Sequence, residues 1–460
     1  MVNNTLKHFC LRVFFMLSHW LIDVDDFANP ESLSLFQKDL PLDWINQALS
    51  ETNKASMRRR KLPAELVVWL VVGIGLYRDR PITDVLDKLD LKLSNSLGET
   101  IAPSAIPQAR KRLTAEPLKS LFSITAKHWT QSEDAGDKWN GLSLFSIDGT
   151  QFRTHDNPSL AEHYQYVYYR KDRHTEYPIV RMCALTSLRS RLIHDVAFGE
   201  SSKGEISYAK DLISSAVPNS LTIFDRCYLS AELMLNWQQE HGTSHWMTPI
   251  KSNVKYEIIE QLDDDGRDLI VEMKVSPQAR KQDPSLPETW KARLTLYPDD
   301  VEQQPNHIQG LLTSLTDRKY SLKSLLDVYF ERWEIENSYG EIKHDMLEDE
   351  ILLRSQSVEG VEQEIWGILI AYNLIRLEIS RIAKEAEVSP LRISFTMALR
   401  DIQDELMWCA IASPGSVPKK LRAMRERVKR YILPEKQKRP KDRTVRFSKT
   451  RYTVRSKHLK

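Results

Sequence analysis

The sequence is poor in the residues that build cross-linked or metal-clustered domains. Its 460 residues include only four cysteines, and none of them forms a CxxC pair: Cys10, Cys183, Cys227 and Cys409. So few and so widely spaced, they exclude a disulfide framework and a zinc site built on Cys spacing, and they indicate reduced thiols in a cytoplasmic protein. Glycine and proline number only 15 and 21, while hydrophobic residues make up 41% of the chain, which indicates a folded, soluble protein.

Long apolar runs are also lacking. The stretch 9–22 reads FCLRVFFMLSHWLI, but Arg12 and His19 interrupt it and no small-residue cleavage site follows. The run 365–375 is bounded by Glu364 and Arg376. Because a membrane span needs about 20 mostly apolar residues, we expect no membrane element in either place. The first stretch is interpreted as an amphipathic helix or as an extension from an upstream start codon.

Net charge is almost absent, at +2, but the charge is unevenly distributed. Residues 419–460 carry 18 Lys and Arg against three acidic residues, whereas the rest of the chain carries 47 basic and 60 acidic residues. A basic tail on an acidic body favours a polyanionic partner, although such a tail is also compatible with a merely solvated segment.

Length and periodicity divide the chain into several parts, because 460 residues are too many for one ordinary core. Apolar residues recur at helical spacing over residues 20–135. There, ITDVLDKL followed by SAIPQARKRL could form a helix-turn-helix with three basic residues on its second helix, Arg110, Lys111 and Arg112. Such helix pairs are common structural motifs, so a role in DNA binding and a purely structural role both remain open.

From residue 142 the pattern changes to that of strands. Three strands (142–152, 177–188 and 191–200) are followed by a helix, a strand ending in TIFD, a second helix and the strand HWMTPI. This order predicts an α/β fold with a mixed sheet and helices on its faces. We predict a helical N-terminal domain over 1–135, a catalytic core over 136–350, a β-rich insertion at 252–306, a helical C-terminal region over 351–415 and a basic tail over 416–460.

The stretch 329–343, YFERWEIENSYGEIK, carries the most informative pattern. At about 100° per residue, one arc of roughly 60° on a helix would present four side chains: Tyr329, Arg332, Glu336 and Lys343. Taken alone, this pattern is more typical of a solvated helix face, where a Glu–Arg pair adds only about 0.2–0.5 kcal/mol.

Two predicted strands end in carboxylates, Asp148 in FSIDGT and Asp225 in TIFDRC. Each alone is readily explained as a turn residue after a strand. If the strands are neighbours, both carboxylates lie at one end of the sheet, where Glu336 would complete a three-carboxylate cluster. Such a cluster suits Mg²⁺, which prefers hard oxygen ligands, and two ions would support phosphodiester displacement.

Over roughly residues 30–410 the chain resembles transposases of the insertion-sequence-four family, DDE enzymes with a ribonuclease-H-like core. The resemblance rests on IDGT, on FDRCY and on the Y-x2-R-x3-E-x6-K signature, together with RKLPAELVVWLVVGIGLYRDRPI, HWMTPIK, SPQARK, LLTSLTD and EQEIWGILIAYNLIR. It implies that three acids bind Mg²⁺, for which Mn²⁺ substitutes: Asp148, Asp225 and Glu336. It further implies that Arg332 and Lys343 hold phosphates of the transposon end and that Tyr329 packs against the displaced strand or a flipped base. Lys251 is a further candidate DNA contact, although a surface lysine is an equally good interpretation.

The sequence departs from this family at a few positions. Some relatives carry a stacking tryptophan on the strand before the signature, where this chain has Gln309 or Gly310. Trp290 could substitute, although an apolar-strand tryptophan is more often a core residue. Gly340 stands where relatives can carry a basic residue, and His344 lies off the functional stripe and is expected to be structural.

The resemblance implies a cut-and-paste DNA transposase that cleaves terminal inverted repeats, passes through a hairpin intermediate and joins the ends to target DNA. It also implies a homodimer in the synaptic complex and a nucleoid-associated location. Two alternatives remain: a catalytically inactive protein that only binds transposon ends, and a metal-dependent nuclease that cleaves DNA but does not join it. The acid triad disfavours the first, and Arg332 with Lys343 disfavours the second.

Overall fold

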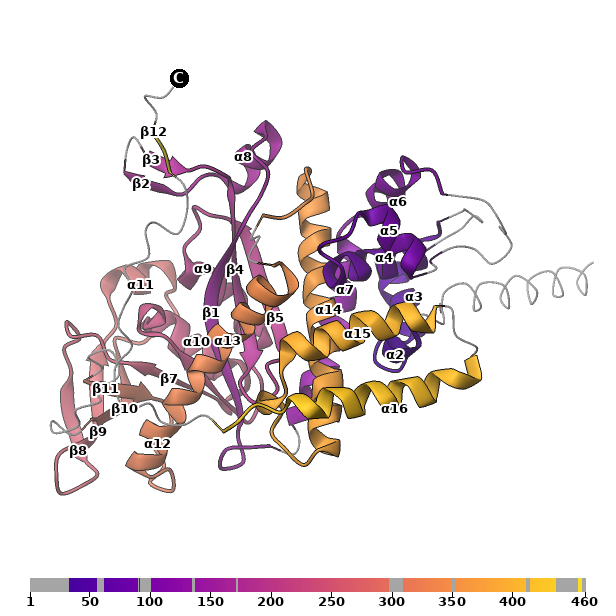
Figure 1. The fold of residues 1–460 in the computed structure, drawn as a ribbon. Coiled ribbons are helices and arrows are strands. Elements are labelled where there is room, and N and C mark those ends of the chain that lie inside the picture. The colour runs from indigo at the N-terminus through magenta and orange to yellow at the C-terminus, as the bar shows by residue number, and fades with distance from the viewer. Residues whose placement is uncertain are drawn as a thin grey trace, which may run out of the picture.

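A nine-stranded mixed sheet forms the centre of the protein (Figure 1). The computed structural model describes residues 33–55, 62–89, 91, 101–134, 137–170, 173–297, 309–348, 352–410, 414–435 and 454–456. The apolar stretch at 9–22 and residues 436–453 and 457–460 of the basic tail therefore lie outside the described residues. Five strands make one half of the sheet, in the spatial order β5-β4-β1-β6-β7: β1 (Ser143–Arg153), β4 (Ile179–Ser187), β5 (Ile193–Glu200), β6 (Ser220–Phe224) and β7 (Ser244–Pro249).

The strand directions confirm the ribonuclease-H-like mixed sheet expected from the sequence. β4 is antiparallel to both β1 and β5, whereas β1, β6 and β7 run parallel to one another. Parallel neighbours require crossover connections, and helices α9 (Glu205–Asp211) and α10 (Ala231–His241) lie in the links to β6 and β7. Side chains alternate along β1, so Phe145 and Ile147 face the core around α9 and α10, while Leu144 and Phe152 face the opposite side.

The β-rich insertion extends this sheet instead of forming a separate one. Its strands are β8 (Glu257–Gln261), β9 (Asp268–Lys274) and β10 (Thr289–Leu296), with the short helix α11 (Pro277–Gln282) between the last two. Strand β11 (Gly310–Thr313) then pairs with β10 on one side and with β7 on the other, with Leu312 opposite Thr248. The second half of the sheet therefore runs β7-β11-β10-β9-β8.

The long helix α14 (Val358–Glu385) lies between the sheet and the N-terminal helices (Figure 1). The N-terminal helices are α2 (Ser34–Gln37), α3 (Leu42–Glu51), α4 (Ala64–Leu76), α5 (Ile82–Lys88), α6 (Ala105–Leu113) and α7 (Glu116–Asp134). α4 is apolar almost all round and crosses α14 at two glycines, where a Cβ on Gly75 would lie 2.9 Å from the carbonyl oxygen of Gly367. One hydrophobic core runs through the N-terminal helices, α14 and one face of the sheet, so these parts are packed together.

The C-terminal part of the described chain is also helical, with α15 (Phe395–Cys409) and α16 (Val417–Val428) packed beside α14 (Figure 1). α16 is the start of the segment expected to be a basic tail, and several of its cations are paired with acids of the protein itself. Arg425 binds Glu378 and Glu385, and Arg427 binds Asp401. Part of the positive charge of this segment is therefore neutralised within the fold.

The remaining elements lie outside the large sheet. Helix α8 (Pro158–Tyr164) follows β1, and a small sheet consists of β2 (Tyr168–Arg170), β3 (Arg173–Thr175) and β12 (Val454–Ser456). Among the described residues, no helix is both long enough and apolar enough to span a membrane.

Candidate active site

Asp148 and Asp225 lie at the same end of two neighbouring parallel strands. β1 and β6 pair in register up to Ile147 and Phe224, so each aspartate follows a paired residue. β6 ends at Phe224, whereas β1 continues to Arg153 with β4 alone on its other side. One edge of β1 is therefore free of strand pairing from Asp148 to Phe152, before Arg153 bridges to Leu352, as expected for a site built at the end of a short parallel strand.

The signature segment is not one regular helix, and in this respect the prediction of a single α-helical face was wrong. α12 (Leu322–Tyr329) passes into a 3₁₀ helix (Phe330–Arg332), then into α13 (Trp333–Gly340), and then into a π-helix (Glu341–Met346). A 3₁₀ turn eclipses residues three apart, so it lines up Tyr329 with Arg332. Mid-helix changes of this kind often mark functional segments, and here buried contacts override the simple local period.

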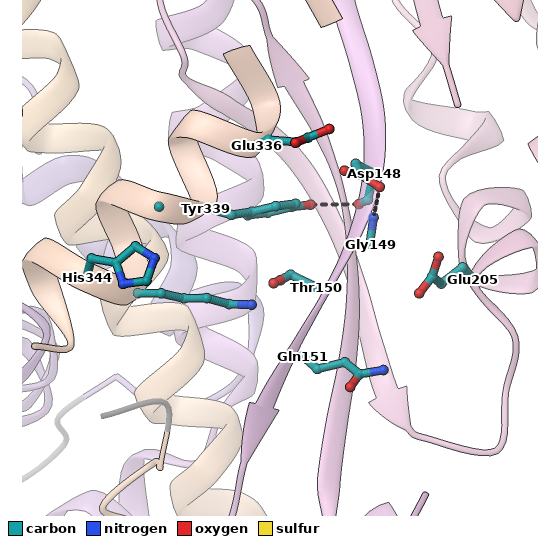
Figure 2. Close-up of a pocket in the computed structure, with 10 residues that line it drawn as sticks. Asp148, Gly149, Thr150, Gln151, Glu205, Glu336, Tyr339 and His344 are labelled. Carbon is teal, nitrogen blue, oxygen red and sulfur yellow. Dashed lines mark hydrogen bonds between the residues drawn. The ribbon is translucent and has the colours of Figure 1, made fainter. Parts of the chain in front are cut away.

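A pocket of about 450 Å³ lies between β1 and this segment (Figure 2). Its walls include Asp148 on β1, Glu336 on α13 and Lys343 on the π-helix. The hydroxyl of Tyr339 donates a hydrogen bond of 2.6 Å to the backbone oxygen of Asp148, which fixes α13 against the strand. The structure thus brings together three of the side chains that the sequence singled out.

The pocket holds Asp148 in an environment that disfavours its charge. Burial raises the pKa of Asp148 from 3.8 to about 6. The backbone N–H of Gly149, which donates to Oδ1 at 2.8 Å, and the charge of Arg332 oppose this rise, while Glu336 and Asp225 add to it. These mutual effects indicate that the three acids and Arg332 share one electrostatic site.

Arg332 lies among the acids and is almost buried, with 7% of its surface exposed. Its Nη2 donates to Oε1 of Glu336 at 3.0 Å, and its charge interacts with those of both aspartates. Glu336 is more open, with 39% of its side chain exposed. The guanidinium therefore partly neutralises the repulsion among the carboxylates.

Tyr329 is only 3% exposed and belongs to the hydrophobic core beside β11. Burial raises its pKa, and the neighbouring Arg332 opposes this rise. The ring is thus not open for stacking on a base in this conformation. Exposed aromatic surface beside it belongs to Phe330 and Trp333, each 43% exposed.

Two other positions considered for base stacking, Gly310 and Trp290, are closed, whereas Gln309 is exposed. Gly310 has no room for a side chain, because a Cβ there would lie 2.6 Å from the carbonyl oxygen of Thr295. Trp290 is buried and packs on Trp246 at 5.5 Å between ring centroids, which is the core role weighed for it from the sequence. By contrast, His344 was expected to be structural, but it lies in the π-helix and lines the pocket together with Lys343. Figure 2 shows His344 at the pocket wall.

The basic residues expected to contact DNA fall into two groups. The Arg110 guanidinium is bound within the protein, by Nε to Gln363 at 3.0 Å and by Nη2 to the backbone oxygen of Gly360 at 3.1 Å. Lys111 and Arg112, on the same helix, are exposed. The Nζ of Lys251 donates to the backbone oxygen of Leu229 at 3.0 Å and so supports the loop that follows Asp225.

The sequence reasoning missed one acid of this pocket. Glu205, the first residue of α9, reaches the pocket at Gly149 (Figure 2). The glycine directly after Asp148 was a signal for it, since a small residue there leaves space beside the strand. Among the residues that the structure describes, no three Asp, Glu, His or Cys side chains are close enough to form a complete metal cage. Carboxylate oxygens are nevertheless the ligands that Mg²⁺ prefers, and Asp148 and Glu336 offer them into one pocket.

Comparison with known proteins agrees with this architecture. Two family models match the chain: "Insertion element 4 transposase N-terminal" over residues 30–123 and "Transposase DDE domain" over residues 139–374. The chain is 34% identical over 435 residues to the transposase InsG for insertion sequence element IS4 of Escherichia coli (strain K12). This alignment covers 93% of the present chain and 95% of InsG. It is 36% identical over 246 residues to the putative transposase InsZ of the same organism, covering 52% and 81%.

Among solved structures, a cryo-EM structure of the piggyBac transposase synaptic complex with hairpin DNA aligns with 90% of this chain and 87% of that chain. Its identity is 12% and its TM-score 0.40, a likeness too distant to inform the site. The two family matches and the long alignment with InsG are decisive. The chain belongs to the insertion-sequence-four family of DDE transposases, which are enzymes that process DNA.

Proposed function

We propose that this protein is a cut-and-paste transposase that hydrolyses phosphodiesters at transposon ends and joins the freed 3′ ends to target DNA, with a hairpin as intermediate. The observation that carries the proposal is the parallel pairing of β1 and β6, which sets Asp148 and Asp225 at one sheet end, facing Glu336 from α13. A protein that only binds DNA has no use for acids converging in this way.

The donor set fits divalent metal ions, because it consists of carboxylates whose charges already repel one another. Asp148, Asp225 and Glu336 would hold Mg²⁺, or Mn²⁺ in its place, and the bound ions would supply an activated water and stabilise the leaving oxygen.

Arg332 and Lys343 bind phosphates of the transposon end in this proposal. Arg332 now pairs with Glu336, so a phosphate that takes over the guanidinium also frees the carboxylate. Lys343 lines the same pocket and supplies a second positive charge. Binding of DNA phosphate and release of Glu336 are thereby coupled through one side chain.

The base displaced during hairpin formation needs an aromatic platform, which is worth about 1–3 kcal/mol per stacked base. Phe330 and Trp333 offer exposed rings beside Arg332, and the Arg332 guanidinium lies 5.4 Å from the Trp333 ring centroid. We therefore assign stacking to this pair, since Tyr329 is buried. Lys111 and Arg112 contact the DNA backbone from the N-terminal helices, and two copies of the chain act together on paired ends.

The test is a strand-transfer assay. The protein is incubated with labelled DNA carrying the terminal repeats that flank its gene, a target plasmid and Mg²⁺, in parallel with Asp148→Ala. Joined products that disappear in the variant support transposition. Cleavage without joining indicates a nuclease, binding without cleavage indicates an inactive end-binding protein, and undiminished activity of Asp148→Ala overturns the site.

A further inference from the structure

Glu205 reaches the catalytic pocket from the side opposite to Glu336. α9 packs on the sheet face of Phe145 and Ile147, whereas α13 lies on the other face. The two acids share one pocket because β6 ends at Phe224, which leaves the edge of β1 open between the two faces. In Figure 2 the Glu205 carboxylate points toward β1 from the far side of the strand.

Gly149 makes room for this carboxylate. A Cβ at position 149 would lie 2.7 Å from Cδ of Glu205 and 3.0 Å from its Oε1. The backbone of Gly149 is not in the left-handed region, so its conformation alone does not require glycine. The need for a glycine here comes from the space that the Glu205 carboxylate occupies.

Glu205 also differs from the other charged residues around it. Lys203 pairs with Asp211, and Lys210 pairs with Glu232, so the nearby lysines are already engaged. Within the described part of the chain, the Glu205 carboxylate has no ion pair or hydrogen bond of its own. The Glu205 carboxylate faces a pocket that is also lined by Asp148, Glu336 and Lys343, so acids outnumber the lysine there and a bound divalent cation would relieve their repulsion.

We propose that Glu205 is a fourth acid of the catalytic pocket, positioning the divalent cation through its water ligands from the side opposite Glu336. Mg²⁺ keeps several waters when it binds few carboxylates, and groups that bind such waters orient the ion and strengthen its binding. The role of Glu205 rests on the proposed metal-dependent function, but cation binding can be measured without DNA.

The first experiment measures Mn²⁺ binding to the full-length protein by electron paramagnetic resonance of the free ion. Glu205→Gln should weaken binding by about 10–100-fold, the usual loss when an outer-shell partner of a metal is removed. Glu240→Gln, on the exposed end of α10, is the charge-matched control and should match the wild type. Affinity of Glu205→Gln within twofold of the control overturns the proposal and leaves Glu205 as a solvated helix residue.

Two further measurements separate a role in positioning from a fault in folding. Gly149→Ala keeps the backbone N–H that donates to Asp148, but its Cβ displaces the Glu205 carboxylate. It should therefore weaken Mn²⁺ binding, as Glu205→Gln does. In strand transfer, Glu205→Gln should raise the half-saturating Mg²⁺ concentration about 10-fold or more, with most of the maximal rate restored at high Mg²⁺. A lowered maximal rate with unchanged half-saturation contradicts the proposal. If the wild type binds Mn²⁺ yet never joins DNA, the transposase proposal fails while the cation-binding result still decides the role of Glu205.

Discussion

Replacing Glu341 with glutamine should lower the free energy of unfolding, because Glu341 anchors the catalytic segment (residues 329–346) to its neighbours. Glu341 begins the π-helix five residues after Glu336 and accepts hydrogen bonds from Arg191 and from the hydroxyl of Tyr372, the latter at 2.8 Å. Nη1 of Arg376 lies 3.5 Å from it. These partners come from the β4–β5 turn and from α14, so one carboxylate ties the catalytic segment to both.

The expected loss follows from burial. The side chains of Arg191 and Glu341 are each 9% exposed, and that of Arg376 is fully buried. Removing one partner of such a pair leaves buried charge uncompensated, which costs about 3–5 kcal/mol of the free energy of unfolding. This corresponds to more than about 100-fold in the unfolding equilibrium constant, since 1.4 kcal/mol is tenfold.

The assay is urea unfolding followed by tryptophan fluorescence, with Glu240→Gln as the exposed control, which should stay within about 0.5 kcal/mol of the wild type. Glu341→Leu combined with Arg376→Met should be less destabilised than Glu341→Gln, because that double variant leaves less buried charge unpaired. A Glu341→Gln protein within about 1 kcal/mol of the wild type would refute the reasoning that this cluster anchors the segment.

Three further predictions concern the rest of the fold. Burial lowers the pKa of His194 from 6.5 to about 4, so its stabilising contribution is present above pH 6.5 and is lost as the pH falls from 6.5 toward 4. Between pH 7.5 and 5.0 the free energy of unfolding of the wild type, measured with urea, should therefore fall by about 2 kcal/mol more than that of His194→Gln. An equal fall in both proteins contradicts this prediction. Arg110→Ala should destabilise the protein by about 1.5–3 kcal/mol, whereas Arg112→Ala should leave stability unchanged and lower the salt dependence of DNA binding by about one unit of slope; the opposite pattern would exchange their roles. Gly367→Ala places a Cβ 2.6 Å from a carbonyl oxygen of α4 and should lower stability by about 1–3 kcal/mol, while Gly415→Ala, which meets no atom within 4 Å, should be neutral in thermal melts.

Part of the site could be predicted from the sequence because its signal is local. An apolar strand followed directly by an aspartate indicates a carboxylate at a strand end, and this reasoning found Asp148 and Asp225. Their neighbouring positions follow from the alternation of strands and helices, which favours parallel pairing. The signature segment pointed to Glu336 only in combination with these two aspartates and with the family resemblance.

The rest could not be predicted because it depends on contacts between distant parts of the chain. Glu334 and Glu341 each pair with Arg191, about 150 residues away in the chain, and the helix around them changes its winding. The sequence left open whether Arg110 contacts DNA or has a structural role, and in the structure its guanidinium fixes the start of α14. Nothing in the local pattern distinguishes an exposed charge from one whose partner is supplied by another element.

The continuity of the sheet into the insertion determines how the insertion can move. β11 is hydrogen-bonded to both β7 and β10, and its residues alternate between two cores, Leu311 on one side and Leu312 on the other. A shift of β11 by one residue in its pairing register would turn Leu311 and Leu312 to the wrong faces and disrupt the packing of both cores. The three insertion strands β8, β9 and β10 are thus joined to the catalytic sheet through β11 as a rigid extension and do not form a hinged lid. Changes in the length of the insertion can therefore be absorbed in the loops at the tips of these strands but not where β11 joins β7.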